Sequence, residues 1–308
     1  MGTPRFAVPS LERIVEAGHG VAAVFTQPDR PSGRERQVHL SPVKEAARRL
    51  SLDVYQPDRI RRPETVEQLA SYRSDVMVVV GYGQLIPQSI IDLPRYGIVN
   101  VHASLLPKYR GAAPIQWAIA NGETTTGVTT MLINAGLDTG NLLLQSETGI
   151  GANETASELS DRLAQAGAGL LADTLSGLEA GSVQRRPQPD HEATLAPILK
   201  KEDGLVDWSM SASQVYNRWR GFLPWPGIYS IFRGQLIHLW KTKPAYDRGL
   251  GSYGSLHAIG RRLLVTCGQD TTLELEEVQL EGRKRVTADA FRNGQRLTSE
   301  DILGERTN

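Results

Sequence analysis

The residues best placed to do chemistry lie in two short motifs between positions 98 and 140. Asn100 and His102 close the apolar run that starts at Ile98. Side chains two positions apart on an extended strand project from the same face, so the amide and the imidazole should point to one place. Asp138 lies in a turn bounded by glycines, Gly136-Leu137-Asp138-Thr139-Gly140. From such a turn its carboxylate could reach the imidazole.

An amide donor, a titratable ring and a carboxylate, without a nucleophile of their own, indicate acyl transfer to an external amine. An amide N–H can stabilise a developing oxyanion, and an imidazole can transfer protons. Taken singly, these residues have ordinary structural explanations: a histidine near an asparagine is commonly structural, and an aspartate between glycines often forms a turn. The combined pattern N-x-H-x-S-L-L-P followed by G-L-D-T-G is far more specific.

The elements that must position these residues alternate between β and α patterns over roughly the first 180 residues. Three continuous apolar runs are typical of strands covered on both faces: Val21–Phe25, Val76–Val80 and Ile98–Val101. Helical patterns separate them, with proline and capping-box signals at their starts. The alternation predicts an α/β fold with a doubly wound, mostly parallel sheet. Such folds bind ligands beyond the carboxyl ends of their strands, which is where Asn100 and His102 fall.

The composition changes after about residue 182, which predicts a second domain. The segment Gln184–Asp190 carries two prolines and little apolar content, as expected for a linker. Farther on the pattern becomes β-rich, with a hairpin centred on Arg233-Gly234. Several short strands in about 100 residues favour a small barrel. We therefore expect a catalytic domain over 1–182, a linker over 183–202 and a barrel domain over 203–308.

Composition limits the classes of partner and cofactor. Basic and acidic residues number 34 each, so no overall charge favours a polyanion and any such contact must be local. The single cysteine, Cys267, rules out an internal disulfide and fits a reducing compartment. No apolar stretch approaches the roughly 20 residues that span a bilayer. The six histidines are scattered without metal-binding spacing, so we expect no protein-bound metal.

Several segments beyond the two motifs match a known family. They are Met1–Pro4, Phe6–Pro9, Thr26–Pro31, Ser41–Lys44, Val79–Gly83, Tyr109–Trp117, Val206–Trp208, Pro224–Pro226 and Gly282–Arg285. The chain resembles the folate-dependent formyltransferases over nearly its whole length. The resemblance implies a Rossmann-like catalytic domain, an OB-like barrel and 10-formyltetrahydrofolate as formyl donor. As acceptor it implies the α-amino group of methionyl initiator tRNA, used in translation initiation, and we expect a monomeric, cytoplasmic enzyme.

The resemblance also implies roles for the site residues. Asn100 would donate its amide N–H to the oxyanion, and His102 would donate as well or protonate the departing folate nitrogen. Asp138 would orient His102 or accept the proton of the amine, and the residue chemistry does not separate these two duties.

The same resemblance implies where the folate binds. The matching segment is Ser104, Leu105, Leu106 and Pro107. Its two leucines could cover an apolar ring face while the backbone binds the ring edge. Gly81 and Tyr82 are expected near this pocket, since glycine permits close backbone approach. No third glycine follows Gly83 at the spacing of a phosphate-binding loop, so no nucleotide cofactor is implied.

Binding of the tRNA acceptor arm is expected to depend on local basic residues. Arg30, Arg34 and Arg36 lie in one loop. The resemblance implies that Arg34 matches the family's arginine that wedges at the first base pair of the acceptor arm. A solvated loop is the commoner explanation of any short basic run. Phosphate contacts, which position a nucleic acid without reading its sequence, could also come from Lys200, Lys201 and Arg283–Arg285.

Two other functions fit parts of the pattern. A related formyltransferase could act on glycinamide ribonucleotide or an amino sugar, but the Gln27–Pro31 loop and the C-terminal barrel argue against it. A nucleic-acid-binding module with a vestigial site is opposed by the joint presence of Asn100, His102 and Asp138.

The start of the chain departs from the family pattern. A doubly wound domain normally begins with a strand, whereas this sequence begins in the following loop, at Met1-Gly2-Thr3-Pro4. A parallel sheet buried on both faces tolerates the loss of a central strand poorly, because its neighbours keep unpaired backbone groups. We therefore expect the first strand to be encoded upstream of Met1.

Overall fold

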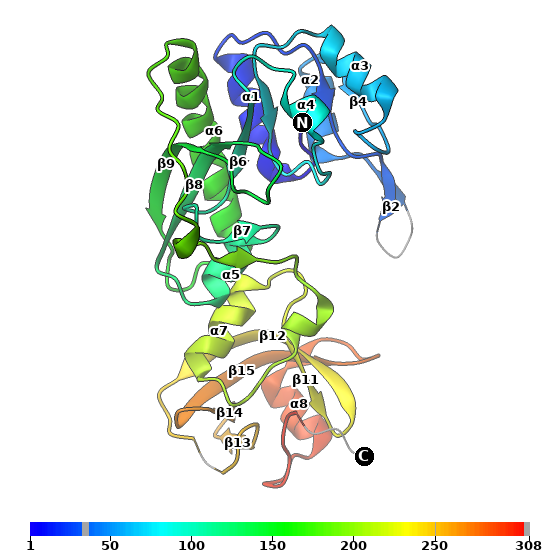
Figure 1. Ribbon diagram of the computed structural model, residues 1–308. Coiled ribbons are helices and arrows are strands. Elements are labelled where there is room, and N and C mark those ends of the chain that lie inside the picture. The colour runs from blue at the N-terminus through cyan, green and yellow to red at the C-terminus, as the bar shows by residue number, and fades with distance from the viewer. Residues whose placement is uncertain (33–36, 250, 305–308) are drawn as a thin grey trace. The chain divides into compact units, whose positions relative to one another are not determined.

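The computed structural model of this chain describes residues 1–32, 37–249 and 251–304 (Figure 1). Two compact units make up the chain. The first comprises residues 1–114, 125–149 and 158–197, and the second comprises residues 115–124, 150–157 and 198–308. The two short segments 115–124 and 150–157 therefore group with the second unit, although the sequence predicts one uninterrupted catalytic domain over 1–182.

The first unit has a parallel core that continues into antiparallel strands. β5 (Met77–Val79) and β6 (Ile98–His102) pair in parallel. β8 (Thr125–Leu132) and β9 (Leu142–Gly149) extend the sheet in the order β5-β6-β8-β9 and are antiparallel. The sequence predicts the parallel strands but not this antiparallel pair. It forms because the connection between β8 and β9 has no crossover helix, which parallel neighbours require.

Three short ladders complete the strands of the first unit. β1 (Val24–Phe25) pairs in parallel with β4 (Val54–Tyr55). β2 (Arg30–Ser32) and β3 (Gln37–His39) are antiparallel, and β7 (Arg110–Gly111) and β10 (Leu195–Ala196) are parallel.

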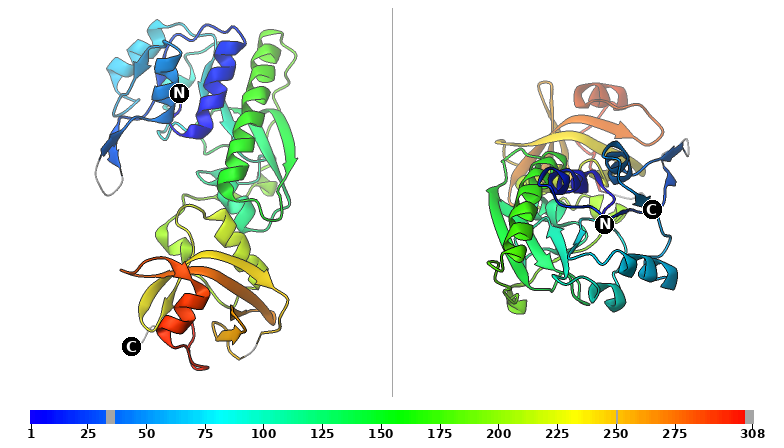
Figure 2. Two further views of the ribbon diagram at one scale, coloured as in Figure 1. Left: turned by 180° about the vertical axis from the view of Figure 1, so that it is seen from behind. Right: turned by 90° about the horizontal axis from the view of Figure 1, so that it is seen from above.

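Helices cover both faces of the sheet, as the alternating pattern predicts. They are α1 (Val8–Glu16), α2 (Pro42–Arg49), α3 (Pro63–Ser71), α4 (Gln88–Ile91) and α6 (Ala156–Glu179). α1 and α6 lie side by side on one face (Figure 2). Gly167 of α6 packs so closely on Val101 and Val128 that a Cβ there would approach a Val101 methyl to 2.9 Å. On the other face, Leu69 of α3 and Ile90 of α4 join the core formed by β5 and β6.

The first two residues bridge β1 and β5. The Met1 nitrogen donates to Val78 O at 2.6 Å, and Val80 N donates to Met1 O at 2.9 Å. On the other side, Gly2 N donates to Phe25 O at 3.0 Å. Met1 and Gly2 therefore connect β1 and β5 through backbone hydrogen bonds.

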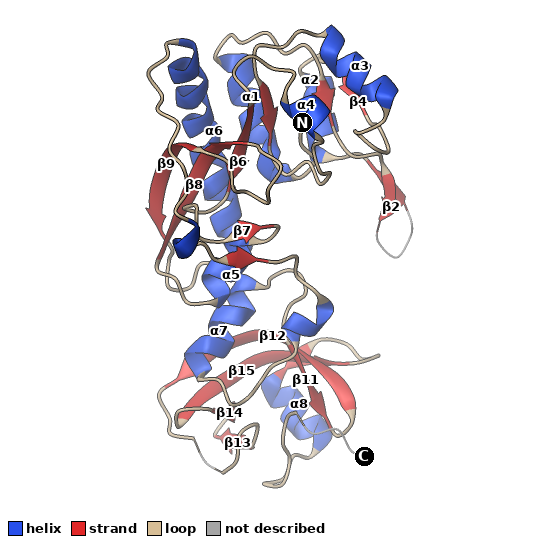
Figure 3. Cartoon of the chain, in the orientation of Figure 1, coloured by secondary structure: helices blue, strands red, loops and turns tan. Residues whose placement is uncertain are grey.

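The second unit is a curled antiparallel half-barrel, consistent with the expected OB-like fold (Figure 3). Its strands are β11 (Tyr229–Phe232), β12 (Gln235–Ala245), β13 (Leu256–Ile259), β14 (Arg262–Cys267), β15 (Thr271–Leu280) and β16 (Val286–Thr287). Its helices are α5 (Pro114–Ala120), α7 (Ala212–Gly221) and α8 (Ala288–Gln295). The predicted hairpin is confirmed: β11 and β12 pair across Arg233-Gly234, both with positive φ (45° and 75°), as a tight turn of type I′ requires.

Candidate active site

Strand β6 brings Asn100 and His102 to one face of the sheet, as their spacing predicts. In the β6–β8 ladder, Asn100 lies opposite Met131 and His102 lies opposite Thr129. Asn100 and His102 are both buried, at 9% and 6% exposure. The Asn100 amide forms no hydrogen bond with any residue that the structure describes. It is therefore available to donate to a ligand that enters the site.

A backbone carbonyl fixes the tautomer of His102. Its Nε2 lies 2.9 Å from Tyr109 O. A carbonyl oxygen can only accept, so Nε2 carries the hydrogen when the ring is neutral. Nδ1 then holds the lone pair and is the nitrogen left to exchange a proton.

Asp138 faces that free nitrogen without a hydrogen bond to it. Its Oδ2 lies 3.7 Å from His102 Nδ1, which is beyond hydrogen-bond range. The same oxygen accepts from Gly111 N at 2.9 Å. Asp138 also has a left-handed backbone, with φ of 51°, in the glycine-bounded turn that the sequence indicates. This geometry suits an ion pair with a protonated His102 better than an orienting hydrogen bond.

The segment expected to be a linker holds the Asp138 turn in place. Gln188 Nε2 donates to Asp138 O at 2.8 Å and to Gly140 O at 2.7 Å. Its Oε1 accepts from Arg110 at 3.0 and 2.9 Å, and Arg110 also donates to Asp190 Oδ1 at 2.8 Å. Arg110 is buried. Gln188 was not predicted from the sequence, because nothing local distinguishes one glutamine in a proline-rich segment.

Backbone pairing ties down the rest of this segment as far as Pro197. Arg186 exchanges two hydrogen bonds with Leu142, and β10 pairs with β7. Of the linker expected over 183–202, the part up to residue 197 therefore pairs with strands of the first unit. These residues pack in the first unit, because their polar backbone finds partners in β7 and β9 that composition cannot reveal.

The expected folate segment forms a turn fixed by two residues that the sequence did not single out. Thr129 Oγ1 donates to Ser104 O at 2.7 Å and accepts from Leu106 N at 3.1 Å. Gln145 Nε2 donates to Leu106 O at 2.9 Å. Ser104 itself is fully buried and donates to the Lys108 carbonyl at 2.6 Å.

The two leucines of this turn have different environments. Leu106 is 3% exposed and packs with Met131 and Leu142 in the core, and Pro107 is also buried. Leu105 is half-buried. Leu105 is therefore the leucine whose side chain can contact a ligand ring, whereas Leu106 can contribute through its backbone.

The Gly81-Tyr82 segment is fixed by its backbone. Tyr82 O accepts from Thr3 Oγ1 at 3.2 Å and from Gln27 Nε2 at 3.0 Å. Gly81 has φ of +58°, and a Cβ there would lie 2.9 Å from the Pro4 ring. The Tyr82 side chain is 1% exposed, and its burial raises the pKa of the phenol to about 12. Tyr82 is thus a core residue that can offer backbone groups to a ligand.

The basic residues expected to contact tRNA are only partly described. Arg34 and Arg36 lie outside the described residues, and Arg30 begins β2. In the second unit, Lys200 and Lys201 are exposed; Lys200 is the N-cap of the short helix η3 (Lys201–Gly204), and Lys201 is its first residue. Arg285 lies over the Trp240 ring at 5.1 Å and pairs with Glu277.

Comparison with known proteins decides the family. A formyl transferase model matches residues 1–175, and a model of the formyl transferase C-terminal domain matches residues 198–296. The chain belongs to the formyl transferase family. It is 59% identical over 305 residues to the methionyl-tRNA formyltransferase of Solibacter usitatus, covering 99% of this chain and 97% of that protein. It is 55% identical to the enzyme of that name from Koribacter versatilis, covering 98% and 97%.

Solved structures support the fold. A sugar 3N-formyl transferase, WlaRD, superposes with a TM-score of 0.66 at 18% identity, covering 92% of this chain and 97% of that one. HypX from Aquifex aeolicus, solved with tetrahydrofolic acid, gives 0.58 at 18% identity, covering 85% and 48%. Within the described residues, no cluster of His, Cys, Asp and Glu could hold a metal ion. No helix in this part of the chain is long and apolar enough to cross a membrane.

Proposed function

We infer that this protein transfers the formyl group of 10-formyltetrahydrofolate to the α-amino group of methionyl initiator tRNA, in the cytoplasm, for translation initiation. The observation that carries this inference is that the Asn100 amide, which has no hydrogen-bond partner among the described residues, lies on the same strand face as His102. The Nδ1 atom of His102 in turn faces Asp138. The high identity to methionyl-tRNA formyltransferases over nearly the whole chain supports the choice of acceptor.

The proposed reaction begins with attack of the neutral amine on the formyl carbon. A carbon–nitrogen bond forms and the carbonyl oxygen becomes an oxyanion. The Asn100 amide N–H donates to this oxyanion where its charge develops. Collapse of the intermediate restores the carbonyl and breaks the bond to the folate nitrogen, which leaves with a proton.

His102 moves the proton between the two nitrogens. Since Nε2 is bonded to Tyr109 O, Nδ1 accepts the proton that the amine loses and delivers it to the departing folate nitrogen. The Asp138 carboxylate, 3.7 Å away, stabilises the transient imidazolium by its charge. Asp138 is therefore proposed as a charge partner of His102, since the orientation of the ring is already set by Tyr109.

The folate donor is proposed to bind along the backbone of Gly81 and Tyr82 and against Leu105. The turn from Ser104 to Pro107 would present its peptide groups to the ring edge. The described residues fit such a ligand because these backbone segments are held rigidly by Thr3, Gln27, Thr129 and Gln145.

The acceptor arm of the tRNA is proposed to contact the loop that carries Arg30, Arg34 and Arg36, with Arg34 wedged at the first base pair. Lys200 and Lys201 would bind phosphates. Replacing Arg34 with alanine should weaken discrimination between acceptor ends while leaving the KM for folate unchanged. A rise in the folate KM with unaltered tRNA kinetics would contradict the assignment.

The function is tested by supplying 10-formyltetrahydrofolate with a labelled formyl group and comparing three acceptors. Methionyl initiator tRNA should be formylated, whereas glycinamide ribonucleotide and a sugar nucleotide with a free amine should not. Preference for either small acceptor would overturn the proposed substrate while leaving the family assignment intact.

A further inference from the structure

Lys44 is the one buried lysine among those that the structure describes, and the proposed reaction does not use it. It lies in the first turn of α2, and its side chain is 10% exposed. Its ammonium group donates to Asp29 Oδ2 and to Gln56 Oε1. Because lysine is almost never buried without a partner, the position of this charge depends on these two acceptors.

Gln56 completes the arrangement around Asp29. Its Nε2 donates to Asp29 Oδ1 at 2.8 Å and to Gln27 O at 2.8 Å. Both carboxylate oxygens of Asp29 therefore have a donor. The hydrogen bond from Lys44, followed by that from Gln56, holds the pKa of Asp29 below its usual range, so the carboxylate stays charged near neutral pH.

This cluster of Lys44, Asp29 and Gln56 lies at the base of the hairpin formed by β2 and β3. Asp29 directly precedes β2 in the chain, and Ser41 follows β3 as the N-cap of α2. A second contact closes the same base, since Thr26 Oγ1 and Ser41 Oγ lie 2.8 Å apart. The two contacts join the chain that enters the hairpin to the chain that leaves it. Beyond them, β2 projects from the body of the first unit (Figure 1).

The base of the hairpin is also anchored to the sheet. Gln27 Nε2 donates to Tyr82 O at 3.0 Å, and Gln27 N donates to Thr3 Oγ1 at 3.3 Å. The hairpin itself pairs over only three residues of each strand, and an isolated two-stranded hairpin is marginally stable at best. The direction in which it leaves the unit therefore depends on the side chains at its base.

The pair between Lys44 and Asp29 acts mainly on geometry. A buried ion pair gives little net stability, because desolvation of the two charges offsets their attraction. Removing one partner, in contrast, leaves the other charge without its main contact. The pair therefore fixes the residue directly before β2 more than it stabilises the fold.

We propose that Lys44 is a positioning residue for tRNA recognition, which acts through Asp29 on the direction of the β2–β3 hairpin. The inference rests on the proposed contact between the loop of this hairpin and the acceptor arm. The ammonium group of Lys44 is committed to Asp29 and Gln56, so its effect on the tRNA is indirect. Without Lys44 the hairpin leaves the unit at a less defined angle, which weakens recognition of the first base pair.

The test compares formyl transfer to two methionyl initiator tRNAs that differ only in the first base pair, one mismatched and one Watson–Crick paired. The measured quantity is the ratio of their kcat/KM values, which does not depend on the fraction of enzyme that is folded. Lys44→Met removes the charge and keeps most of the length of the side chain. Arg49→Met is the matched control, since it removes an exposed charge of the same helix that pairs with Glu12.

Lys44→Met should lower this ratio by about 10-fold, because small displacements of a positioning group carry costs of this order or larger. The KM for 10-formyltetrahydrofolate should not change, and Arg49→Met should leave the ratio unaltered. Asp29→Asn keeps the shape of the side chain but loses the ion pair, and it should lower the ratio by a smaller factor. An unchanged ratio in both Lys44→Met and Asp29→Asn would overturn the proposal.

A double substitution separates positioning from an independent contribution. If Lys44 acts through the loop, Lys44→Met should have no further effect on the ratio once Arg34 is replaced with alanine. Additive effects of the two substitutions would overturn the role of Lys44 and leave the proposed tRNA contact intact. An unchanged ratio in Arg34→Ala alone would instead refute that contact, and the role of Lys44 with it.

Discussion

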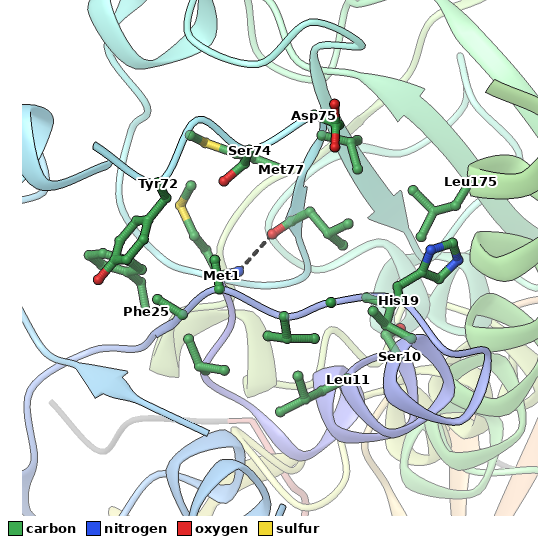
Figure 4. A pocket seen from close by; sticks show the side chains of 18 of the residues that line it. Met1, Ser10, Leu11, His19, Phe25, Tyr72, Ser74, Asp75, Met77 and Leu175 are labelled. Atoms are coloured by element: carbon green, nitrogen blue, oxygen red, sulfur yellow. Dashed lines mark hydrogen bonds between the residues drawn. The ribbon is translucent and has the colours of Figure 1, made fainter. Parts of the chain in front are cut away.

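The two edges of β5 differ in how completely they are paired. On one edge, Met77–Val79 lie in register with β6 across three residues. On the other edge, Met1 pairs beside Val78 and Val80, and the rest borders a cavity (Figure 4). Asn100 and His102 lie on the completed side. The candidate catalytic residues therefore lie on the side where the ladder is continuous. We expect the incompletely paired edge to affect the stability of the fold more than the rate of the catalytic step.

The largest effect is expected for His102→Ala, on the completed edge. Loss of a positioned proton carrier should lower kcat by roughly 10²–10⁴-fold, with little change in Tm. Turnover should be measured with saturating methionyl initiator tRNA, and thermal unfolding serves as the control. Activity near that of the unaltered enzyme would remove His102 from the mechanism.

The second-largest effect on turnover is expected for Asn100→Ala. Removal of one oxyanion donor typically costs about 10²–10³-fold in kcat, while the KM values should change little because the amide acts on the developing charge. Single-turnover formyl transfer isolates this step. A change confined to KM would show instead that Asn100 binds substrate in its ground state.

The smallest effect on turnover is expected for substitutions of Gln188, which supports the Asp138 turn. Gln188→Ala removes two donors to that turn, each worth about 1 kcal/mol, and should lower kcat by about 10-fold. Gln188→Glu, which keeps an acceptor for Arg110 but cannot donate, should have a similar effect. Gln184→Ala, an exposed change in the same segment, is the matched control. Equal kcat in the two alanine variants would show that Gln188 does not position Asp138.

The sequence predicted those features that depend on local periodicity. Alternation along a strand puts Asn100 and His102 on one face, and the Arg233-Gly234 pair specifies the β11–β12 turn. Glycines around Asp138 predict the turn in which its left-handed backbone is found. Each is a relation between near neighbours in the chain, so residue types and spacing are sufficient to predict it.

Only the tertiary structure decided the features that join distant residues. Gln188 is 50 positions from Asp138 and 78 from Arg110, so no local pattern reports their contact. The 3.7 Å gap between His102 and Asp138, and the bond from His102 to Tyr109 O, depend on how two loops pack. The cavity between β1 and β5 likewise exists only once separate βα units assemble, because the neighbours of a strand are set by the tertiary fold.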